Sequence, residues 1–260
     1  MRMLSLLQRC LFVVAVSLAV VSSLHAQEDR PVKNIVLVHG AWVDGAGWEA
    51  VYRILSSKGY AVSVVQNPLT SFEDDVAAVE RVLARQDGPV LLVGHSYGGA
   101  VIAQAGNADN VAGLAFVAAF VPDSGESVSS LLEGGQPPPL QPSKDGFLFF
   151  DPTIFPVAFA HDVDPDRATF LAASQVPTAG KALATPVTVA AWKTRPSVYL
   201  LTTEDRIIPP ALQRRMALRA GAEIAELAAG HAVYLSRPGE VAEVLDRAAQ
   251  GLSGGARSKR

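Results

Sequence analysis

Six short apolar runs recur along the chain, and segments with a different spacing separate them. The runs are nearly continuous in Val, Leu, Ile and Ala rather than alternating with polar residues. They are NIVLVHG (34–40), AVSVVQN (61–67), PVLLVGH (89–95), VAGLAFVAAFV (111–121), PSVYLLTTED (196–205) and AEIAELAAGH (222–231). Continuous apolar runs of this length are typical of parallel strands that are covered on both faces. The pattern therefore predicts six buried strands in a parallel sheet.

The segments between these runs place their apolar residues on one helical face. In the first of them, Trp48, Val51 and Leu55 share such a face. In the next, Ser71 lies three residues before Asp74 and the pair resembles a capping box. Helices are expected over 48–59, 71–83, 100–105, 209–221 and from 236 onward. This alternation predicts an α/β fold, with a mostly parallel six-stranded sheet, helices on both faces and right-handed crossovers.

One segment, residues 122–195, breaks the alternation. It contains QPPPLQP, the aromatic stretch FLFFDPTIFPVAFA and a helix-like piece over 166–174. The segment is too long for a plain loop, and its phenylalanines argue against a solvated excursion because aromatic side chains need burial or a ligand. Ligands of open α/β sheets bind beyond the carboxyl ends of the strands. We therefore expect a short inserted cap over those ends.

The N-terminus has the composition of an export signal. Arg2 and Arg9 flank its start, the run Leu11–Leu24 is uncharged, and a small residue, Ala26, marks the expected cleavage site. A retained membrane anchor is the alternative, but the run is shorter than the ~20 residues that a spanning helix needs. We expect a signal peptide over 1–26, export to the periplasm or the medium without stable membrane insertion, and a single domain over 27–260.

Composition narrows the chemistry and the partners. The formal net charge is −3, and the only basic stretch is the Gly-rich terminal GGARSKR, so nothing indicates nucleic-acid binding. The single cysteine, Cys10, falls in the expected signal peptide, which excludes disulfides and thiol chemistry from the mature chain. The sequence has no H-E-x-x-H motif, no closely spaced His/Asp set and no G-x-G-x-x-G fingerprint. We expect no metal and no cofactor; the sequence leaves the oligomeric state open.

The stretch LLVGHSYGGAV places Ser96 between Gly94 and Gly98, directly after an apolar run. G-x-S-x-G between a strand and a helix is typical of a nucleophile elbow, a sharp turn that exposes the serine hydroxyl. Residues two before and two after the serine approach each other there, so both must lack bulk. Alone, the pattern also fits a Gly-rich turn or a phosphate loop. The strand before it and the helix after it favour Ser96 as a nucleophile.

A serine hydroxyl needs a base, and enzymes with this elbow carry serine, acid and histidine in that order along the chain. Among the five histidines only His231 follows a late strand, so we expect it to be the base. Asp205, at the end of the run 196–205, is expected to orient the imidazole. Glu204 beside it and the more distant Asp123 are alternatives for the acid. Asp205 could also cap the following helix.

The oxyanion formed by attack on a carbonyl needs two hydrogen-bond donors. The backbone N–H of Tyr97, next to the nucleophile, lies at a helix N-terminus and is one candidate. The second is the N–H of Ala41 in LVHGAW, where Gly40 lets the backbone come close. Losing one such donor typically costs about 3 kcal/mol in the transition state. We expect His39 to be a structural hydrogen-bonding residue behind this loop.

Over nearly all of residues 32–250, the chain resembles the α/β-hydrolase fold superfamily. HGAW, GHSYGG, FVAAFVPDSGES, TEDRIIPP and GHAVYLSRP stand in the order and spacing of that family. Within it, the chain is similar to small bacterial esterase-like members related to plant methylesterases and hydroxynitrile lyases. The resemblance implies hydrolysis of a small-molecule carboxylic ester by Ser96, Asp205 and His231 without a cofactor.

Departures from the family pattern narrow the expected reaction. Hydroxynitrile lyases of this group carry a threonine in place of Gly40 and a lysine where this chain has Ala232, which disfavours cyanohydrin cleavage. Ser96 in place of an aspartate argues against epoxide hydrolases and haloalkane dehalogenases. A cofactor-free perhydrolase or haloperoxidase, and a ligand-binding module like the plant hormone receptors of this fold, are alternatives. The aromatic cap leads us to expect a small-to-medium ester with an apolar or aromatic group.

Overall fold

The centre of the molecule is a six-stranded parallel sheet with the strand order β2-β1-β3-β4-β8-β9. The structure is a computed structural model, which describes residues 31–135 and 138–255. The strands are β1 (Asn34–Val38), β2 (Ala61–Val64), β3 (Val90–His95), β4 (Val111–Val117), β8 (Ser197–Thr202) and β9 (Glu223–Leu227). The predicted fold class is confirmed. The expected signal peptide over 1–26 lies outside the described residues.

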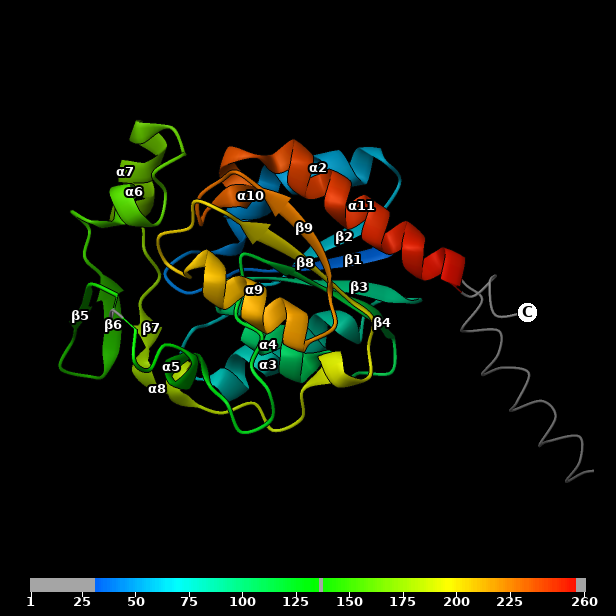
Figure 1. Ribbon diagram of the computed structural model, residues 1–260, viewed down its shortest axis with the longest axis horizontal. Helices are drawn as coiled ribbons and strands as arrows, with labels where there is room; N and C mark the ends of the chain where they lie inside the picture. The colour runs from blue at the N-terminus through cyan, green and yellow to red at the C-terminus, as the bar shows by residue number, and fades with distance from the viewer. Residues whose placement is uncertain (1–30, 136–137, 256–260) are drawn as a thin grey trace, which may run out of the picture.

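Helices cover both faces of this sheet (Figure 1). On one face lie α2 (Glu49–Ser57) and α11 (Pro238–Gly255), and on the other α3 (Phe72–Leu83), α4 (Gly98–Ala105) and α9 (Pro210–Arg219). Side chains alternate along each strand, so every central strand contributes to two cores. In β1, Ile35 and Leu37 pack toward α2 and α11, while Val36 and Val38 pack toward α3 and α4. This double coverage explains the continuous apolar runs.

The two outermost strands are less buried than predicted. β2 and β9 have half-buried or exposed side chains, whereas all five side chains of β1 and all six residues of β3 are buried. The prediction of six buried strands is therefore wrong for these two. An edge strand has a neighbour on one side only, and its apolar run looks like that of a central strand in the sequence.

The helix α3 begins where its capping signal predicted. The Ser71 hydroxyl oxygen accepts a hydrogen bond from the Asp74 N–H at 3.1 Å. The Asp74 carboxylate accepts from the Thr70 hydroxyl at 2.8 Å, outside the capping-box pattern. Half of the expected motif therefore forms, and it is sufficient to start the helix.

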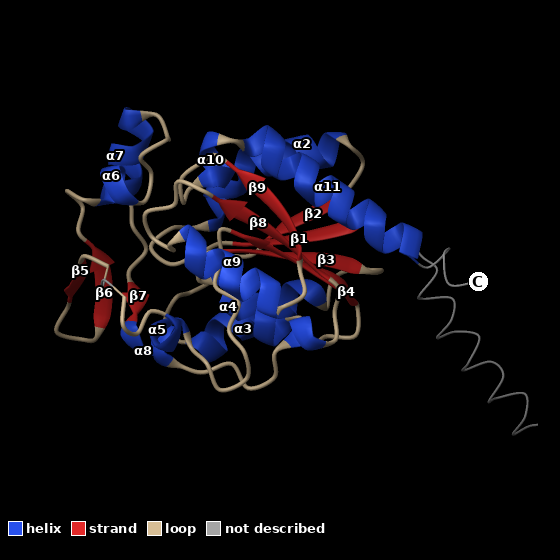
Figure 2. Cartoon of the chain, viewed as in Figure 1, coloured by secondary structure: helices blue, strands red, loops and turns tan. Residues whose placement is uncertain are grey.

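The segment between β4 and β8 has secondary structure of its own. Its helices are α5 (Val128–Leu131), α6 (Phe155–Ala158), α7 (Pro165–Ala173) and α8 (Gly180–Ala184), and its strands β5 (Leu140–Pro142), β6 (Phe147–Phe150) and β7 (Thr178–Ala179) form a small antiparallel sheet. These elements lie beyond one end of the main sheet (Figures 1 and 2). The small sheet was not expected, because strands of two to four residues carry no readable pattern.

The last part of the expected cap, which was placed over 122–195, runs elsewhere. Gln104 on α4 accepts hydrogen bonds at its Oε1 from the N–H of Thr188, 2.9 Å, and from that residue's hydroxyl, 3.0 Å. The chain at Thr188 therefore runs beside α4 toward β8 and does not cover the carboxyl ends of the strands. Within the two described ranges, no helix combines the length and apolar character that a bilayer span requires.

Candidate active site

Ser96 lies on the sharp turn that joins β3 to α4. Its φ of +53° is in the left-handed region, which is strained for a residue with a side chain. The flanking glycines make this turn possible. A Cβ on Gly94 would lie 2.5 Å from the carbonyl oxygen of Gly98, and one on Gly98 would lie 2.7 Å from that of His39. Both distances are below contact, so the two glycines meet a steric need of the turn.

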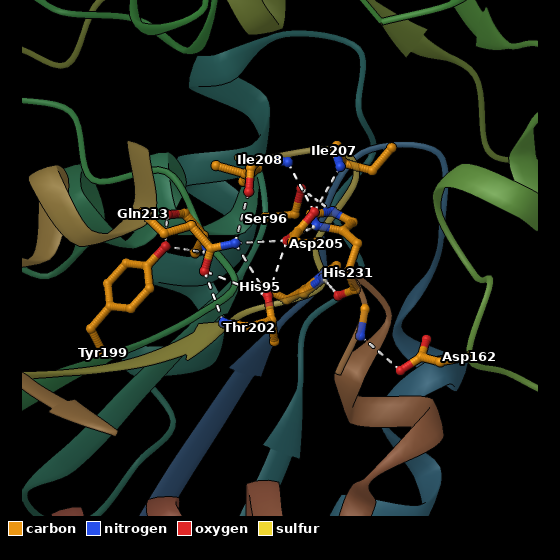
Figure 3. Close-up of polar contacts among 12 residues, drawn as sticks. His95, Ser96, Asp162, Tyr199, Thr202, Asp205, Ile207, Ile208, Gln213 and His231 are labelled. Carbon is orange, nitrogen blue, oxygen red and sulfur yellow. Dashed lines mark hydrogen bonds and ion pairs between the residues drawn. The ribbon is translucent and has the colours of Figure 1, made fainter. Parts of the chain in front are cut away.

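The structure brings Ser96, His231 and Asp205 into one hydrogen-bonded chain (Figure 3). His231 Nε2 lies 2.9 Å from Ser96 Oγ, and His231 Nδ1 lies 2.8 Å from Asp205 Oδ2. Asp205 follows β8 and His231 follows β9, so parallel strands deliver both to the edge where β3 ends. All three residues are buried. With Nδ1–H donated to the carboxylate, Nε2 is free to accept the serine proton.

Five hydrogen-bond donors converge on the Asp205 carboxylate. Besides the histidine, Oδ1 accepts from the N–H groups of Ile207 (2.7 Å) and Ile208 (2.9 Å). Oδ2 accepts from the Thr202 hydroxyl (3.1 Å) and from Nε2 of Gln213 (2.9 Å). Thr202 and Gln213 were not expected from the sequence. The available signal was a glutamine eight residues after the aspartate, which the structure buries on the inner face of α9.

The two alternative acids point elsewhere. Glu204 is 57% exposed at its side chain, and its Oε2 lies 4.0 Å from Nε2 of His161. Asp123 forms an ion pair with Lys193. The structure therefore brings Asp205, of the three carboxylates considered, to the Nδ1 of the histidine.

Ala41 and Tyr97, the two residues expected to bind the oxyanion, lie at the same cavity as the serine. Both residues and Ser96 line one cavity of about 440 Å³. A Cβ on Gly40 would lie 2.8 Å from the Ser96 Cβ, so this glycine lets the loop after β1 approach the serine. Among residues 31–135 and 138–255, neither the Ala41 N–H nor the Tyr97 N–H donates to a backbone carbonyl. The two groups are thus candidates for binding an oxyanion.

His39 supports the loop that carries Ala41. Its Nδ1 donates to the Gly40 carbonyl at 2.8 Å, and its Nε2 accepts from the Asn67 N–H at 2.9 Å. The Asn67 side chain in turn donates to the His39 carbonyl at 3.0 Å. Burial lowers the pKa of His39, which keeps the ring neutral and Nε2 able to accept. His39 therefore has the structural hydrogen bonds expected of it.

A buried carboxylate anchors the Tyr97 side chain. The Tyr97 hydroxyl donates to Asp75 Oδ2 at 2.6 Å, and the N–H of Leu69 donates to Asp75 Oδ1 at 2.8 Å. Burial raises the pKa of Asp75 to about 6, partly offset by the Tyr97 hydrogen bond. This pair, which sequence analysis did not identify, fixes the residue directly after Ser96.

His95, directly before Ser96, is hydrogen-bonded to the backbone of the loop that carries His231. Its Nε2 donates to the carbonyl oxygen of His231 at 2.9 Å. Its ring packs against Tyr234, with centroids 4.6 Å apart. Burial, helped by the neighbouring His231, holds the pKa of His95 well below its usual value. His95 is therefore a neutral donor that holds the His231 backbone.

The cavity above Ser96 is mainly apolar. Its apolar walls come from the β1 and β4 loops, the inserted segment and the loop before α9, as Trp42, Phe120, Val128, Leu132, Leu140, Leu148, Leu183 and Ile207. A second cavity of about 680 Å³ adjoins it and shares Leu132, Glu133 and Ile207 in its wall. Two exposed guanidinium groups, Arg206 and Arg215, line this second cavity. A substrate that reaches the serine thus meets mostly hydrocarbon.

Comparison with known proteins agrees with this architecture. The pyrethroid hydrolase of Sphingobium wenxiniae is 28% identical over 248 residues, which cover 82% of this chain and 86% of that protein. The carbendazim hydrolyzing esterase of Nocardioides sp. is 36% identical over 124 residues, 40% of this chain and 49% of that protein. The crystal structure of a pyrethroid hydrolase from Sphingobium faniae JZ-2 aligns with a TM-score of 0.73 and 26% identity, covering 84% of this chain and 97% of that one.

A family model described as the alpha/beta hydrolase family matches residues 35–244, which extend from β1 into α11. The matched range contains the turn with Ser96, the loops with Asp205 and His231, and the inserted segment. Because the family model matches most of the chain and the fold aligns with that of the crystal structure named above, this chain belongs to the alpha/beta hydrolase family.

Proposed function

We propose that this protein is a serine hydrolase of carboxylic esters. The observation that carries the proposal is the chain of hydrogen bonds from Asp205 through His231 to Ser96, 2.8 and 2.9 Å long, at the floor of an apolar cavity. The relatives named above are a hydrolase and an esterase by description. The fold alone would not support an activity, but the site and the relatives point to the same one.

In the proposed reaction, His231 Nε2 takes the Ser96 proton as Oγ attacks the ester carbonyl. The N–H groups of Ala41 and Tyr97 bind the resulting oxyanion, and Asp205 stabilises the imidazolium. The C–O bond to the alcohol then breaks, and the alcohol leaves with the proton from His231. Water, deprotonated by the same imidazole, attacks the acyl-enzyme and releases the acid.

The cavities suggest which esters fit. About 440 Å³ with apolar walls accommodates a small-to-medium apolar or aromatic group. The adjoining cavity of about 680 Å³ provides room for a second arm. We propose that, of the cap expected over 122–195, residues 128–135 and 138–184 cover the site, since their side chains form much of both walls.

Labelling with a fluorophosphonate probe and turnover of p-nitrophenyl esters test the activity. Wild type should be labelled and should hydrolyse esters with apolar or aromatic acyl groups. Ser96→Ala should lose both properties with its melting temperature retained. Ser57→Ala, which removes an exposed hydroxyl on α2, is the matched control and should behave as wild type. A wild type that is neither labelled nor active would refute the proposal, and a strong preference for charged substrates would refute the apolar substrate class.

We also propose that the chain is exported after cleavage near Ala26. The basic start and the uncharged run before that residue support this. N-terminal sequencing of the protein from periplasm and medium should find Gln27 first. An uncleaved N-terminus in the membrane fraction would show an anchor instead.

A further inference from the structure

The carboxylate of Asp162, in the inserted segment, is hydrogen-bonded to the loop that carries His231. Asp162 follows α6, and its Oδ2 accepts from the Gly230 N–H at 2.8 Å and from the Ser236 hydroxyl at 2.7 Å. Gly230 directly precedes His231, and Ser236 is the last residue of α10 (Val233–Ser236). A single oxygen atom therefore joins the chain on both sides of the histidine.

The same piece of the insert packs against the backbone and the ring of this loop. A Cβ on Gly230 would lie 2.5 Å from Cε1 of His161 and 2.6 Å from Oδ1 of Asp162. The Phe159 ring meets the His231 ring edge-on, with centroids 4.7 Å apart and planes at 80°. Residues 159–162 thus form one continuous contact with the histidine and the residue before it.

Three restraints act on His231 from different directions. Asp205 holds Nδ1 of its ring, and His95 holds its carbonyl oxygen. Asp162 holds the N–H of the preceding residue, outside the hydrogen-bonded chain that leads to the serine. Removing Asp162 would leave the ring partners and the His95 hydrogen bond in place but release the Gly230 N–H and the Ser236 hydroxyl.

We propose that Asp162 is a positioning residue for His231: by binding Gly230 and Ser236 it keeps the imidazole Nε2 at 2.9 Å from Ser96 Oγ. This inference rests on the proposed hydrolase function. Hydrogen bonds to a carboxylate are among the stronger ones in proteins, so a single residue can set the loop. A misplacement of about 1 Å in a catalytic group can cost on the order of 100-fold in rate.

Steady-state kinetics of Asp162→Ala, normalised to active sites by probe titration, test this role. We expect kcat to fall about 10- to 100-fold with KM changed less than about threefold, because the cavity lining is untouched. Asp162→Asn retains an acceptor oxygen for the Gly230 N–H and should recover most of kcat. Asp164→Ala is the matched control: it removes the N-cap of α7 two residues away, so it should lower the melting temperature but leave kcat within about twofold.

A second readout does not depend on turnover. The Nδ1 proton of His231, hydrogen-bonded to Asp205, should give a downfield proton NMR resonance that broadens or shifts in Asp162→Ala and persists in Asp164→Ala. If Asp162→Ala does not fold, Gly230→Ala replaces it, since its Cβ collides with the same pair. Unchanged kcat and an unchanged resonance in the folded variant would overturn the inference. A wild type without esterase activity whose resonance still responds to Asp162→Ala would refute the hydrolase function and leave the positioning role standing.

Discussion

At Asp205, five hydrogen-bond donors meet one carboxylate, whereas the alternative acids Glu204 and Asp123 contact other partners. Its Oδ1 accepts hydrogen bonds from the N–H groups of Ile207 and Ile208 in the loop before α9, and its Oδ2 faces the imidazole. The possible role of Asp205 as a helix cap is not observed, because α9 begins at Pro210 after Pro209 and no side chain caps it. Sequence order favoured this residue but left Glu204 and Asp123 as alternatives, and it gave no sign of the Gln213 amide that holds the carboxylate.

Substitution of Asp205 and of Glu204 tests which carboxylate acts on His231. Asp205→Asn should reduce kcat/KM on the order of 10⁴-fold, because an amide cannot stabilise the imidazolium or hold its tautomer. Glu204→Gln, next to it, should stay within about twofold, since that side chain faces His161 and solvent. Both are measured with one p-nitrophenyl ester at pH 7.5. Greater damage from Glu204→Gln would reassign the acid.

The buried pair of Asp75 and Tyr97 predicts a pH effect on stability. The folded-state pKa of Asp75, about 6, lies above the ordinary 3.8, so the folded protein binds this proton more tightly than the unfolded chain. The resulting stabilisation is complete below about pH 4 and is lost as the pH rises through about 6. Relative to Asp75→Asn, wild type should gain about 1 kcal/mol in free energy of unfolding between pH 7 and pH 5.

Urea unfolding at the two pH values measures this difference. Asp74→Asn removes the neighbouring exposed carboxylate, whose pKa is lowered chiefly by the Ser71 hydrogen bond. That control should show no such gain over the same range. An equal pH response in wild type and Asp75→Asn would show that Asp75 is ionised without penalty.

At the scale of elements, the turn between β3 and α4 depends on residues that carry no side chain. The glycines at 94 and 98 were expected because of a motif, and the structure supplies the reason in distances to backbone oxygens. Gly99 gives a third case, since a Cβ there would lie 2.3 Å from the Phe120 carbonyl oxygen. Nothing in the sequence separates that glycine from an ordinary helical one, because the obstacle belongs to the loop after β4.

Substituting alanine for Gly98 in α4 and for Gly251 in α11 should therefore change the free energy of unfolding in opposite directions. Gly98→Ala should destabilise by about 1–3 kcal/mol or more, because its Cβ meets backbone that cannot move without shifting β1. Gly251→Ala, in α11, meets nothing within 4 Å and should stabilise by up to about 1 kcal/mol. Thermal unfolding of both variants gives the comparison. Equal melting temperatures would contradict the steric account of the turn.

The strands show where element prediction succeeded and where it failed. Central strands were predictable because coverage on both faces leaves a continuous apolar run. The edges β2 and β9 carry runs of similar composition, and only their place in the sheet leaves them partly exposed. The three short strands of the insert depend on pairing with one another, which no local pattern encodes.

For the whole molecule, the two adjoining cavities make a prediction about substrate size. Ala211→Trp would fill part of the second cavity without touching the lining of the cavity above Ser96. We expect kcat/KM for esters with two bulky arms to fall about 10-fold, and that for p-nitrophenyl acetate to stay within about twofold. Leu218→Trp, on the exposed side of the same helix, is the control. An equal loss for large and small esters would show that the second cavity is not used.

What the sequence by itself determined was the set of groups and their order: six apolar runs, a serine on a glycine-flanked turn, an aspartate and a histidine after later runs. These features can be predicted because the sterics of a tight turn and the burial of a strand both restrict which residues occur next to one another in the sequence. Tertiary structure alone decided which carboxylate meets the imidazole, which buried side chains hold it, and how the insert reaches the His231 loop through Asp162. Those contacts join residues 8 to 136 positions apart, and their geometry depends on how the sheet packs its helices and the insert rather than on any local spacing.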